Sequence, residues 1–167
     1  MNLKELLQSK PKKKINYTDL LNCDEWFVKR NIILERDKNK CKICQTEKSL
    51  GPIYSGNSKF YFREVKGEIK GEQEKIYLQV HHKFYIIGKL PWEYDNSDLI
   101  TVCNICHQNI HTTEEISVYD KTKTKKYKLE SCDRCGGSGF ISEYQHVENG
   151  ICFKCRGIGS RLPIFEI

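Results

Sequence analysis

Four C-x-x-C pairs constrain the fold of this chain more than any other feature. They contain eight of the nine cysteines among its 167 residues. In each pair the chain bends back so that two thiolates can reach one metal ion, and two pairs complete a tetrahedral site closed to solvent. Without a secretory signal, cysteines at this spacing are more typical of metal ligands than of disulfides. The sequence therefore predicts two structural zinc sites.

The cysteine pairs divide into two sets by position. The first set has a middle spacer of 58 residues, so its zinc would clamp the two ends of a subdomain; the alternative is buried cysteines paired by chance. The second set has a spacer of 16 residues and repeats the pattern C-x-x-C-x-G-x-G. The expected ligands are Cys41, Cys44, Cys103 and Cys106 for the first zinc, and Cys132, Cys135, Cys152 and Cys155 for the second.

Length and composition limit the class of protein. With 38% hydrophobic and 30% charged residues, the chain can bury one modest core. It is too short for a TIM barrel of roughly 250 residues. No apolar run is long enough for a signal peptide or a spanning helix, so we expect a soluble, cytoplasmic protein with no membrane partner. A net charge of +6 gives a mild bias toward a polyanionic partner.

The N-terminal half begins with a polar segment and a helix. Residues 1–22 form a basic arm whose cluster Lys10–Lys14 is either a solvated tail or a phosphate-contacting element. Residues 24–36 predict an amphipathic helix. Its expected apolar stripe consists of Trp26, Val28, Ile32 and Ile33.

The middle of the chain predicts strands followed by a helix. Apolar residues alternate with polar ones around residues 60–65 and again at 76–80, which favours two antiparallel strands joined by a Gly-containing turn. A short buried strand is expected at 99–102, and a short helix at 104–111. Residues 120–130 are rich in Lys and Thr and predict a linker to a separate module at 131–167.

Four histidines form a second candidate cluster. His107 and His111 are four residues apart on the expected helix, so both imidazoles can bind one ion. His81 and His82 end a strand and point to opposite faces, so only one of them can easily join that site. Partial coordination by protein leaves room for water and phosphate oxygens, as in catalytic metal sites. The alternative is that two or three of these histidines are ordinary surface or zinc-shell residues.

These motifs together resemble the HNH endonuclease family in its zinc-supported form. The resemblance covers roughly residues 24–113 and rests on Leu-Glu-Arg-Asp before the first C-x-x-C, on Val-His-His at 80–82, and on C-x-x-C-H-x-x-x-H at 103–111. It implies a ββα-metal core, in which two antiparallel strands and a helix surround one divalent ion. The expected fold class is therefore α+β, with this core clamped by a four-cysteine zinc and followed by a zinc ribbon.

The resemblance also implies a role for each site residue. His82 matches the general base, and His81, His107 and His111 match the ligands of the catalytic ion. Asp98 stands where the family usually has the Asn that orients the loop around the base. This is a departure, because a carboxylate accepts hydrogen bonds but cannot donate one as an amide does. Asn96, two residues earlier, is the alternative for that role.

The implied activity is metal-dependent hydrolysis of DNA phosphodiester bonds, leaving a 5′-phosphate and a 3′-hydroxyl. The implied catalytic ion is Mg, Mn, Ni or Zn, and histidine ligands favour the later transition metals. The DNA is expected to be double-stranded. The candidate DNA contacts are Arg30, Arg36, Lys154 and Arg156.

The C-terminal repeat resembles the cysteine-rich zinc module of DnaJ chaperones, with two repeats in place of the usual four. This implies one zinc and no chaperone activity; the module can serve nucleic acid, a protein partner or stability alone. The expected domains are 1–22, a nuclease domain at 23–119 with an inserted β-hairpin, the linker 120–130 and the module 131–167. The alternative functions are a non-catalytic zinc-dependent nucleic-acid-binding protein and a protein-interaction adaptor acting through residues 131–167.

Overall fold

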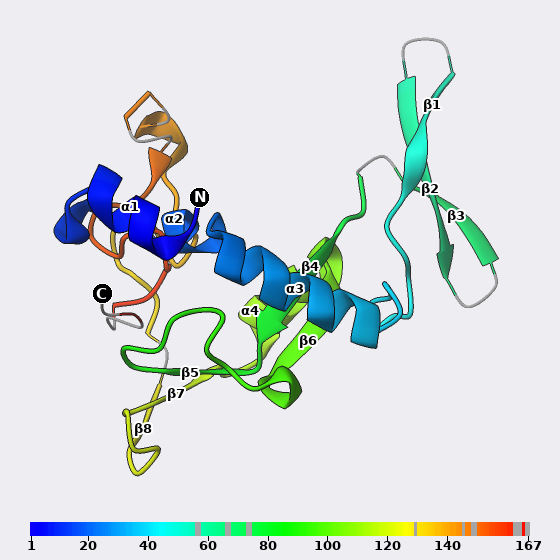
Figure 1. Cartoon of the computed structure of the whole chain (residues 1–167). Helices are drawn as coiled ribbons and strands as arrows, with labels where there is room; N and C mark the ends of the chain where they lie inside the picture. Colours follow the sequence, from blue (N-terminus) through cyan, green and yellow to red (C-terminus); the bar gives the residue numbers. More distant parts are fainter. Residues whose placement is uncertain are drawn as a thin grey trace. The chain divides into compact units, whose positions relative to one another are not determined.

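The computed structural model describes residues 1–55, 58–65, 68–72, 75–128, 130–144, 146–147, 150–161 and 165 (Figure 1). It is an α+β protein, as predicted. The chain forms two compact units: unit 1 comprises Met1–Lys29, Phe84–Asp95 and Glu115–Ile167, and unit 2 comprises Arg30–Lys83 and Asn96–Glu114. Within the described residues, each helix lacks the length and apolarity that crossing a membrane requires.

The helices are short apart from two. The α-helices are α1 (Leu3–Ser9), α2 (Tyr17–Leu21), α3 (Asp24–Arg36) and α4 (Asn104–Thr113), and the 3-10 turns are η1 (Lys12–Lys14), η2 (Asn96–Asp98) and η3 (Ser142–Tyr144). The strands are β1 (Leu50–Ser55), β2 (Ser58–Val65), β3 (Glu68–Glu72), β4 (Leu78–His82), β5 (Phe84–Ile86), β6 (Leu99–Cys103), β7 (Ser117–Tyr119) and β8 (Lys126–Lys128).

The N-terminal segment is folded and is not a tail. Asn2 and Asn16 each cap a helix, and in both cases an acidic side chain three residues later completes a capping box. The apolar side chains of Leu6, Ile15 and Leu20 are buried. They pack in one cluster with residues from both ends of unit 1. The three lysines of η1 remain exposed.

Helix α3 has the predicted bounds but only part of the predicted apolar stripe. Trp26 and Ile33 are buried, at 5% and 0% exposure. Val28 and Ile32 are exposed, at 62% and 44%. Residues seven apart lie almost above one another at 3.6 residues per turn, whereas Val28 and Ile32 are four apart on another face. The buried stripe is therefore narrower than the sequence pattern indicates.

The expected pairing of the strand near residue 62 with the strand near residue 78 is wrong. Strand β2 pairs antiparallel with β1 and β3, so the predicted insertion includes a three-stranded sheet. Strand β4 instead pairs antiparallel with β6, with Leu78 opposite Cys103 and His82 opposite Leu99. Alternation identifies a strand and its faces but does not select its partner. In the observed pairing Leu78, which is buried, lies opposite the fully buried Cys103.

Strands β4 and β6 and helix α4 form the part of unit 2 that positions the candidate site. Helix α4 begins directly after β6 and packs against both strands. Cys103 caps the helix, because its sulfur accepts the Cys106 amide at 3.4 Å. The order strand, strand, helix is that of the core expected from the sequence.

The segment expected as a linker contains ordered structure. Strand β7 pairs in parallel with β5 and antiparallel with β8. The turn between β7 and β8 is fixed by the carboxylate of Asp120, which accepts the amides of Thr124 and Lys125. A low apolar content indicates exposure here, but hydrogen bonds from a short polar side chain can order a turn without a core.

The C-terminal module has little regular secondary structure. Two isolated antiparallel bridges, Ser131 with Ser160 and Phe140 with Ile151, connect its two cysteine-containing halves. The buried cysteines themselves form the centre of the module. A small segment with so few apolar side chains needs another source of stability, such as a metal ion.

Candidate metal centres

The first four-cysteine cluster lies in unit 2. Cys41 and Cys44 follow α3 in a turn, Cys103 ends β6, and Cys106 lies in the first turn of α4. Their four sulfur atoms lie within 4.8 Å of one another. Sulfur ligands of a tetrahedral zinc, each about 2.3 Å from the metal, are about 3.8 Å apart. The Sγ atoms of Cys44 and Cys103 are 3.7 Å apart, so the cluster fits a zinc ion.

The backbone around this cluster is arranged to stabilise thiolates. The Cys44 amide donates to the sulfur of Cys41 at 3.5 Å, as the Cys106 amide does to that of Cys103. The hydrogen bond from the Cys103 thiol lowers the pKa of Cys41 to about 4, and the same contact raises the pKa of Cys103. These contacts thus favour the thiolate form of Cys41 even before a metal ion binds.

Arg36 and Asp37 hold the first cysteine turn against β6. The Arg36 guanidinium donates to the Asp37 carboxylate and to the carbonyl oxygens of Asn96 and Leu99. Asp37 also accepts the amide of Thr101 at 2.9 Å. Burial opposes ionisation of Asp37, but these hydrogen bonds lower its pKa overall. The sequence analysis used the Arg-Asp pair before the first C-x-x-C only as part of the resemblance and assigned Arg36 to DNA, so it missed this scaffold.

The second four-cysteine cluster lies in unit 1. Its four sulfur atoms also lie within 4.8 Å of one another. The sulfur of Cys132 is 4.0 Å from that of Cys152, and the sulfur of Cys135 is 3.7 Å from that of Cys155. The amides of Gly139 and Gly159 each donate to a cluster sulfur at 3.3 Å. The two halves of the repeat therefore make equivalent contacts around a site that fits zinc.

We expect Gly159→Ala to disrupt this module. Gly159 has a φ of +81°, and a Cβ there would overlap the carbonyl group of Gly137. The left-handed conformation alone costs a non-glycine residue about 1–3 kcal/mol, and the overlap adds to it. Zinc retained per chain during titration with a chelator should fall in the variant.

The matched control is Gly136→Ala. Gly136 also has a positive φ, +61°, but a Cβ there meets no atom within 4 Å. The Gly136→Ala variant should therefore carry the cost of the left-handed backbone conformation without a steric overlap. Equal zinc retention by the two variants would contradict the close packing of Gly159 against the Gly137 carbonyl.

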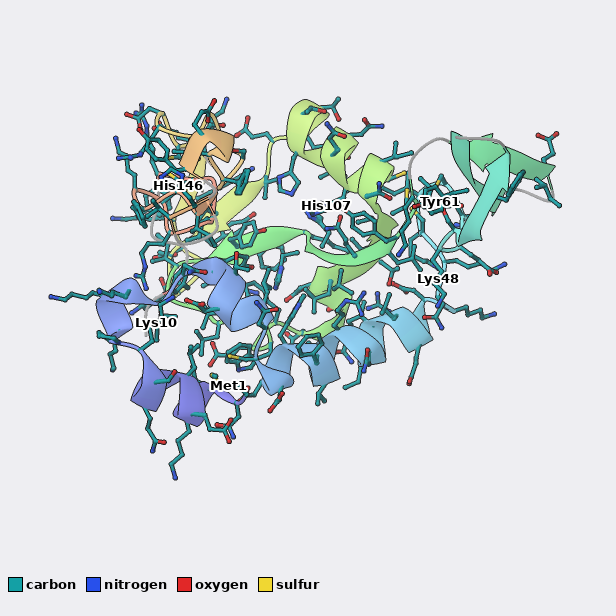
Figure 2. The ribbon with its side chains drawn as sticks, turned by 90° about the horizontal axis from the view of Figure 1, so that it is seen from above. Met1, Lys10, Lys48, Tyr61, His107 and His146 are labelled. Carbon is teal, nitrogen blue, oxygen red and sulfur yellow. The ribbon has the colours of Figure 1, made fainter. Side chains whose placement is uncertain are left out.

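The histidine cluster lies in unit 2, on β4 and α4. One nitrogen from each of His81, His107 and His111 falls within 4.8 Å of the others. The Nε2 atoms of His107 and His111 are 3.3 Å apart, and the three ring centroids are 4.6–5.1 Å apart (His107 is labelled in Figure 2). Exposure increases from buried His81 to exposed His111, so the cluster opens on the side of His111.

The three imidazoles are held neutral. Burial, with the charges of His107 and His111, lowers the pKa of His81 to about 3. Burial and His111 lower the pKa of His107 to about 4, and burial lowers the pKa of His111. Neutral imidazole is the form that binds metal. The three imidazoles therefore stay in the uncharged form at neutral pH, and this form can bind a metal cation.

A buried nitrogen supports the fit to a metal ion. The Nδ1 atom of His81 is buried and has no hydrogen-bond partner among the described residues. A buried polar atom left without a partner costs about 1–3 kcal/mol. Three neutral imidazoles, one with such an atom, form a donor set suited to a late first-row divalent ion. The residues therefore fit a metal ion, and the outward side would leave coordination positions for other ligands.

His82 and Asp98 lie next to this cluster in the fold but outside it. His82 follows His81 on β4, and its imidazole is 3% exposed. Its nitrogens are not part of the converging group found among the described residues. Asp98 directly precedes Leu99, the residue paired with His82, and its carbonyl accepts the Lys83 amide at 2.9 Å. Its Oδ2 atom is buried and has no hydrogen-bond partner among the described residues.

The four predicted DNA contacts each have an acceptor within the protein. Arg30 donates to the Leu78 carbonyl at 3.0 Å, and Arg36 is part of the scaffold described above. Arg156 donates to the carbonyls of Lys12 and Ile15, and Lys154 pairs with Asp133 at 2.7 Å. Each of these side chains thus has a structural role within the protein. Their contact with DNA stays a prediction.

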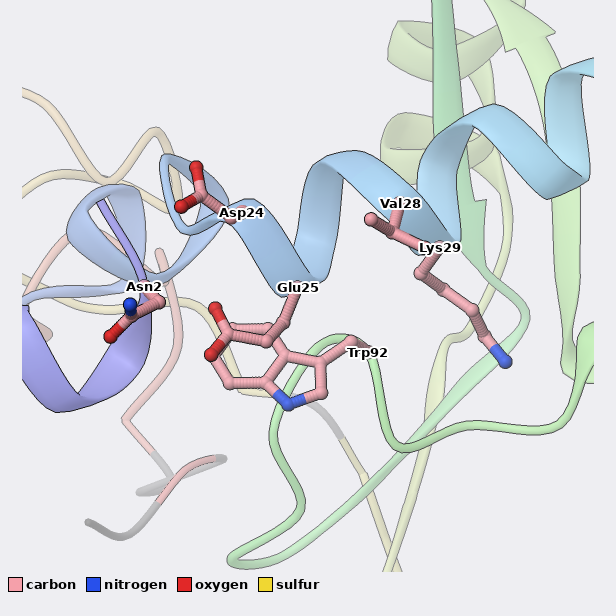
Figure 3. A pocket seen from close by; sticks show the side chains of 6 residues that line it. All are labelled: Asn2, Asp24, Glu25, Val28, Lys29 and Trp92. Carbon is pink, nitrogen blue, oxygen red and sulfur yellow. The ribbon is translucent and has the colours of Figure 1, made fainter.

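A separate pocket of about 510 Å³ lies in unit 1 (Figure 3). Its lining contains none of the clustered cysteines or histidines. The Leu3 amide donates to Glu25, and the Met1 ammonium pairs with Asp24, so both acids on this pocket have partners. The lining residues are Asn2, Asp24, Glu25, Val28, Lys29 and Trp92.

Comparison of the chain with protein-family models, with curated proteins and with solved structures found no match. The functional assignment below therefore rests on the residues and their geometry.

Proposed function

We propose that the protein is a metal-dependent endonuclease of the HNH type that hydrolyses phosphodiester bonds in double-stranded DNA. The observation that carries the proposal is the convergence of His81, His107 and His111 on a strand, strand, helix element, with one side open. A structural zinc site is closed by four protein ligands, whereas a catalytic site keeps a position for water or substrate. Three neutral imidazoles beside an exposed edge match the description of a catalytic site.

In the proposed mechanism His81, His107 and His111 would hold a divalent ion. When bound, this ion supplies positive charge that stabilises the phosphate oxygens and the departing oxygen. His82 accepts a proton from the attacking water as the new bond to phosphorus forms and the bond to the 3′ oxygen breaks. Asp98, one residue from the position opposite His82, would orient the loop around the base, and the contact that supports this role is its backbone carbonyl, which accepts the Lys83 amide.

The burial of His82 favours a second candidate function. A general base must come within about 3 Å of the proton that it removes, so the nuclease proposal requires the bound DNA to uncover His82. If His82 stays covered, the protein is a non-catalytic, zinc-dependent nucleic-acid-binding protein. An adaptor acting through residues 131–167 is the third candidate, and no contact among the described residues of that module favours it over stability.

The proposal also assigns the metal ions of the three clusters and the cellular location of the protein. We assign one structural zinc to each four-cysteine cluster and one exchangeable ion, Mg, Mn, Ni or Zn, to the three histidines. The nine cysteines form no disulfide bond. Paired thiols that bind metal are typical of a reducing compartment, so we place the protein in the cytoplasm.

Cleavage of supercoiled plasmid by the purified full-length chain tests the proposal. We expect nicked or linear product, with 5′-phosphate ends, when a divalent ion is added. A His107→Ala variant should require more added ion for the same rate. Intact plasmid at every ion concentration, with the protein bound to it, would leave the non-catalytic candidate in its place.

A further inference from the structure

Five lysines of the chain gather in one short segment. Residues 121–128 read Lys-Thr-Lys-Thr-Lys-Lys-Tyr-Lys, with five lysines and no acidic residue. The whole chain has 28 Lys and Arg against 22 Asp and Glu. Without these five lysines, 23 basic residues face 22 acidic ones, so the remainder of the chain is almost neutral.

This segment is an ordered hairpin. In β7 and β8, Ser117 pairs with Lys128 and Tyr119 pairs with Lys126. The turn is closed by Asp120, whose Oδ1 accepts the Thr124 amide at 2.7 Å and the Lys125 amide at 3.0 Å. Its Oδ2 accepts the hydroxyls of Thr122 and Thr124. We call residues 117–128 the lysine hairpin.

Two acidic residues, Asp120 and Glu115, contact the lysine hairpin. Both oxygens of Asp120 are occupied by donors of the turn itself, and the Lys125 amide and Thr122 hydroxyl lower its pKa to about 2. Glu115 pairs with Lys128 at 3.7 Å. The Lys123 ammonium lies 5.0 Å from the centre of the Phe84 ring. All residues from 121 to 128 are exposed.

We propose that the lysine hairpin binds the phosphate backbone of duplex DNA. Lysine ammonium groups on flexible stems bind phosphate as point charges, with little dependence on base sequence. A dense row of such charges on a fixed hairpin suits a polymer with regularly spaced phosphates. The choice of DNA over another polyanion rests on the proposed function, because the histidine cluster of the same chain suits phosphodiester chemistry.

The test compares two sets of lysines on the full-length protein. One variant is K125Q/K126Q in the hairpin, and the matched control is K4Q/K48Q, which changes two lysines that are also exposed. Binding to a fluorescent duplex is measured by anisotropy without added divalent ion, over a range of salt concentrations. Melting curves and zinc content should match those of the wild type, since only exposed side chains change.

The hairpin variant should bind duplex about a hundredfold more weakly at about 0.1 M salt, and its affinity should approach that of the wild type near 1 M. Its slope of log affinity against log salt should flatten by about 0.9 for each lost phosphate contact. The control variant should change neither quantity. If the hairpin variant folds poorly, Lys126→Gln alone should flatten the slope by about 0.9.

Unchanged affinity and slope in the hairpin variant would overturn the proposal, as would an equal loss in the K4Q/K48Q control. Loss of binding to phosphatidylserine vesicles with unchanged duplex binding would overturn it and assign the hairpin to a lipid surface. Hairpin-dependent binding without cleavage would refute the nuclease proposal and support this one. The two proposals therefore fail separately.

Discussion

Replacing His82 with alanine should lower the rate of DNA cleavage by about 10²- to 10⁴-fold, the usual contribution of a general base. Metal binding should remain, because His82 lies outside the three converging imidazoles. His81→Ala should instead weaken the ion, and added metal should partly restore its activity. The contrast comes from strand geometry, since neighbouring side chains face opposite sides. Cleavage rate measured against metal concentration separates the two variants.

The matched control for both variants is His146→Ala. His146 is exposed and lies outside the three clusters, so its loss should leave rate and metal dependence unchanged. Rescue of His82→Ala, but not of His81→Ala, by excess metal would reverse the two roles. Full activity in both variants would refute the assignment of the histidines.

Replacing Cys103 with serine should unfold much of unit 2. Cys103 is fully buried, caps α4 and ends β6, so the loss of its sulfur affects the strand, the helix and the zinc together. Structural zinc contributes about 10 kcal/mol of apparent folding free energy in small domains. Losing even about 3 kcal/mol would lower the Tm of a small domain by about 12–24 °C. Thermal melting and zinc content, expected to fall from two ions to one, are the measurements.

Cys23→Ser is the control for this change. Cys23 is buried at 2% exposure and belongs to neither cluster, and its sulfur lies 3.5 Å from the Asp19 carbonyl. A serine hydroxyl can make the same hydrogen bond, so zinc content should stay at two. An unchanged melting curve for Cys103→Ser would show that the first cluster does not clamp the fold.

The metal ligands could be predicted from the sequence because their spacing is local. A C-x-x-C pair brings its own two sulfurs together, and histidines four apart share a helix face, whatever the rest of the chain does. The contribution of His81 was predictable from the resemblance and from its place at a strand end. Local spacing indicated the eight cysteines, His107 and His111, the resemblance added His81, and the structure brings these residues together in three clusters.

The features that could not be predicted depend on partners distant in the sequence. Alternation marked residues 60–65 and 76–80 as strands, but pairing of β4 with β6 depends on residues about twenty positions later. Arg36 looked like a free cation, and only the fold brings the carbonyls of Asn96 and Leu99 to it. The lysines after Asp120 looked like a linker, because the sequence does not show that its carboxylate would close a turn.

The central claim is that an exchangeable ion on the three histidines, and not either zinc, supports cleavage. The most direct measurement is plasmid cleavage by protein treated with a mild chelator, with its zinc content determined on the same sample. We predict close to two zinc ions per chain, no cleavage in chelator, and cleavage restored by an added divalent ion. Full cleavage in chelator, or no cleavage with any ion while both zincs remain, would contradict the account.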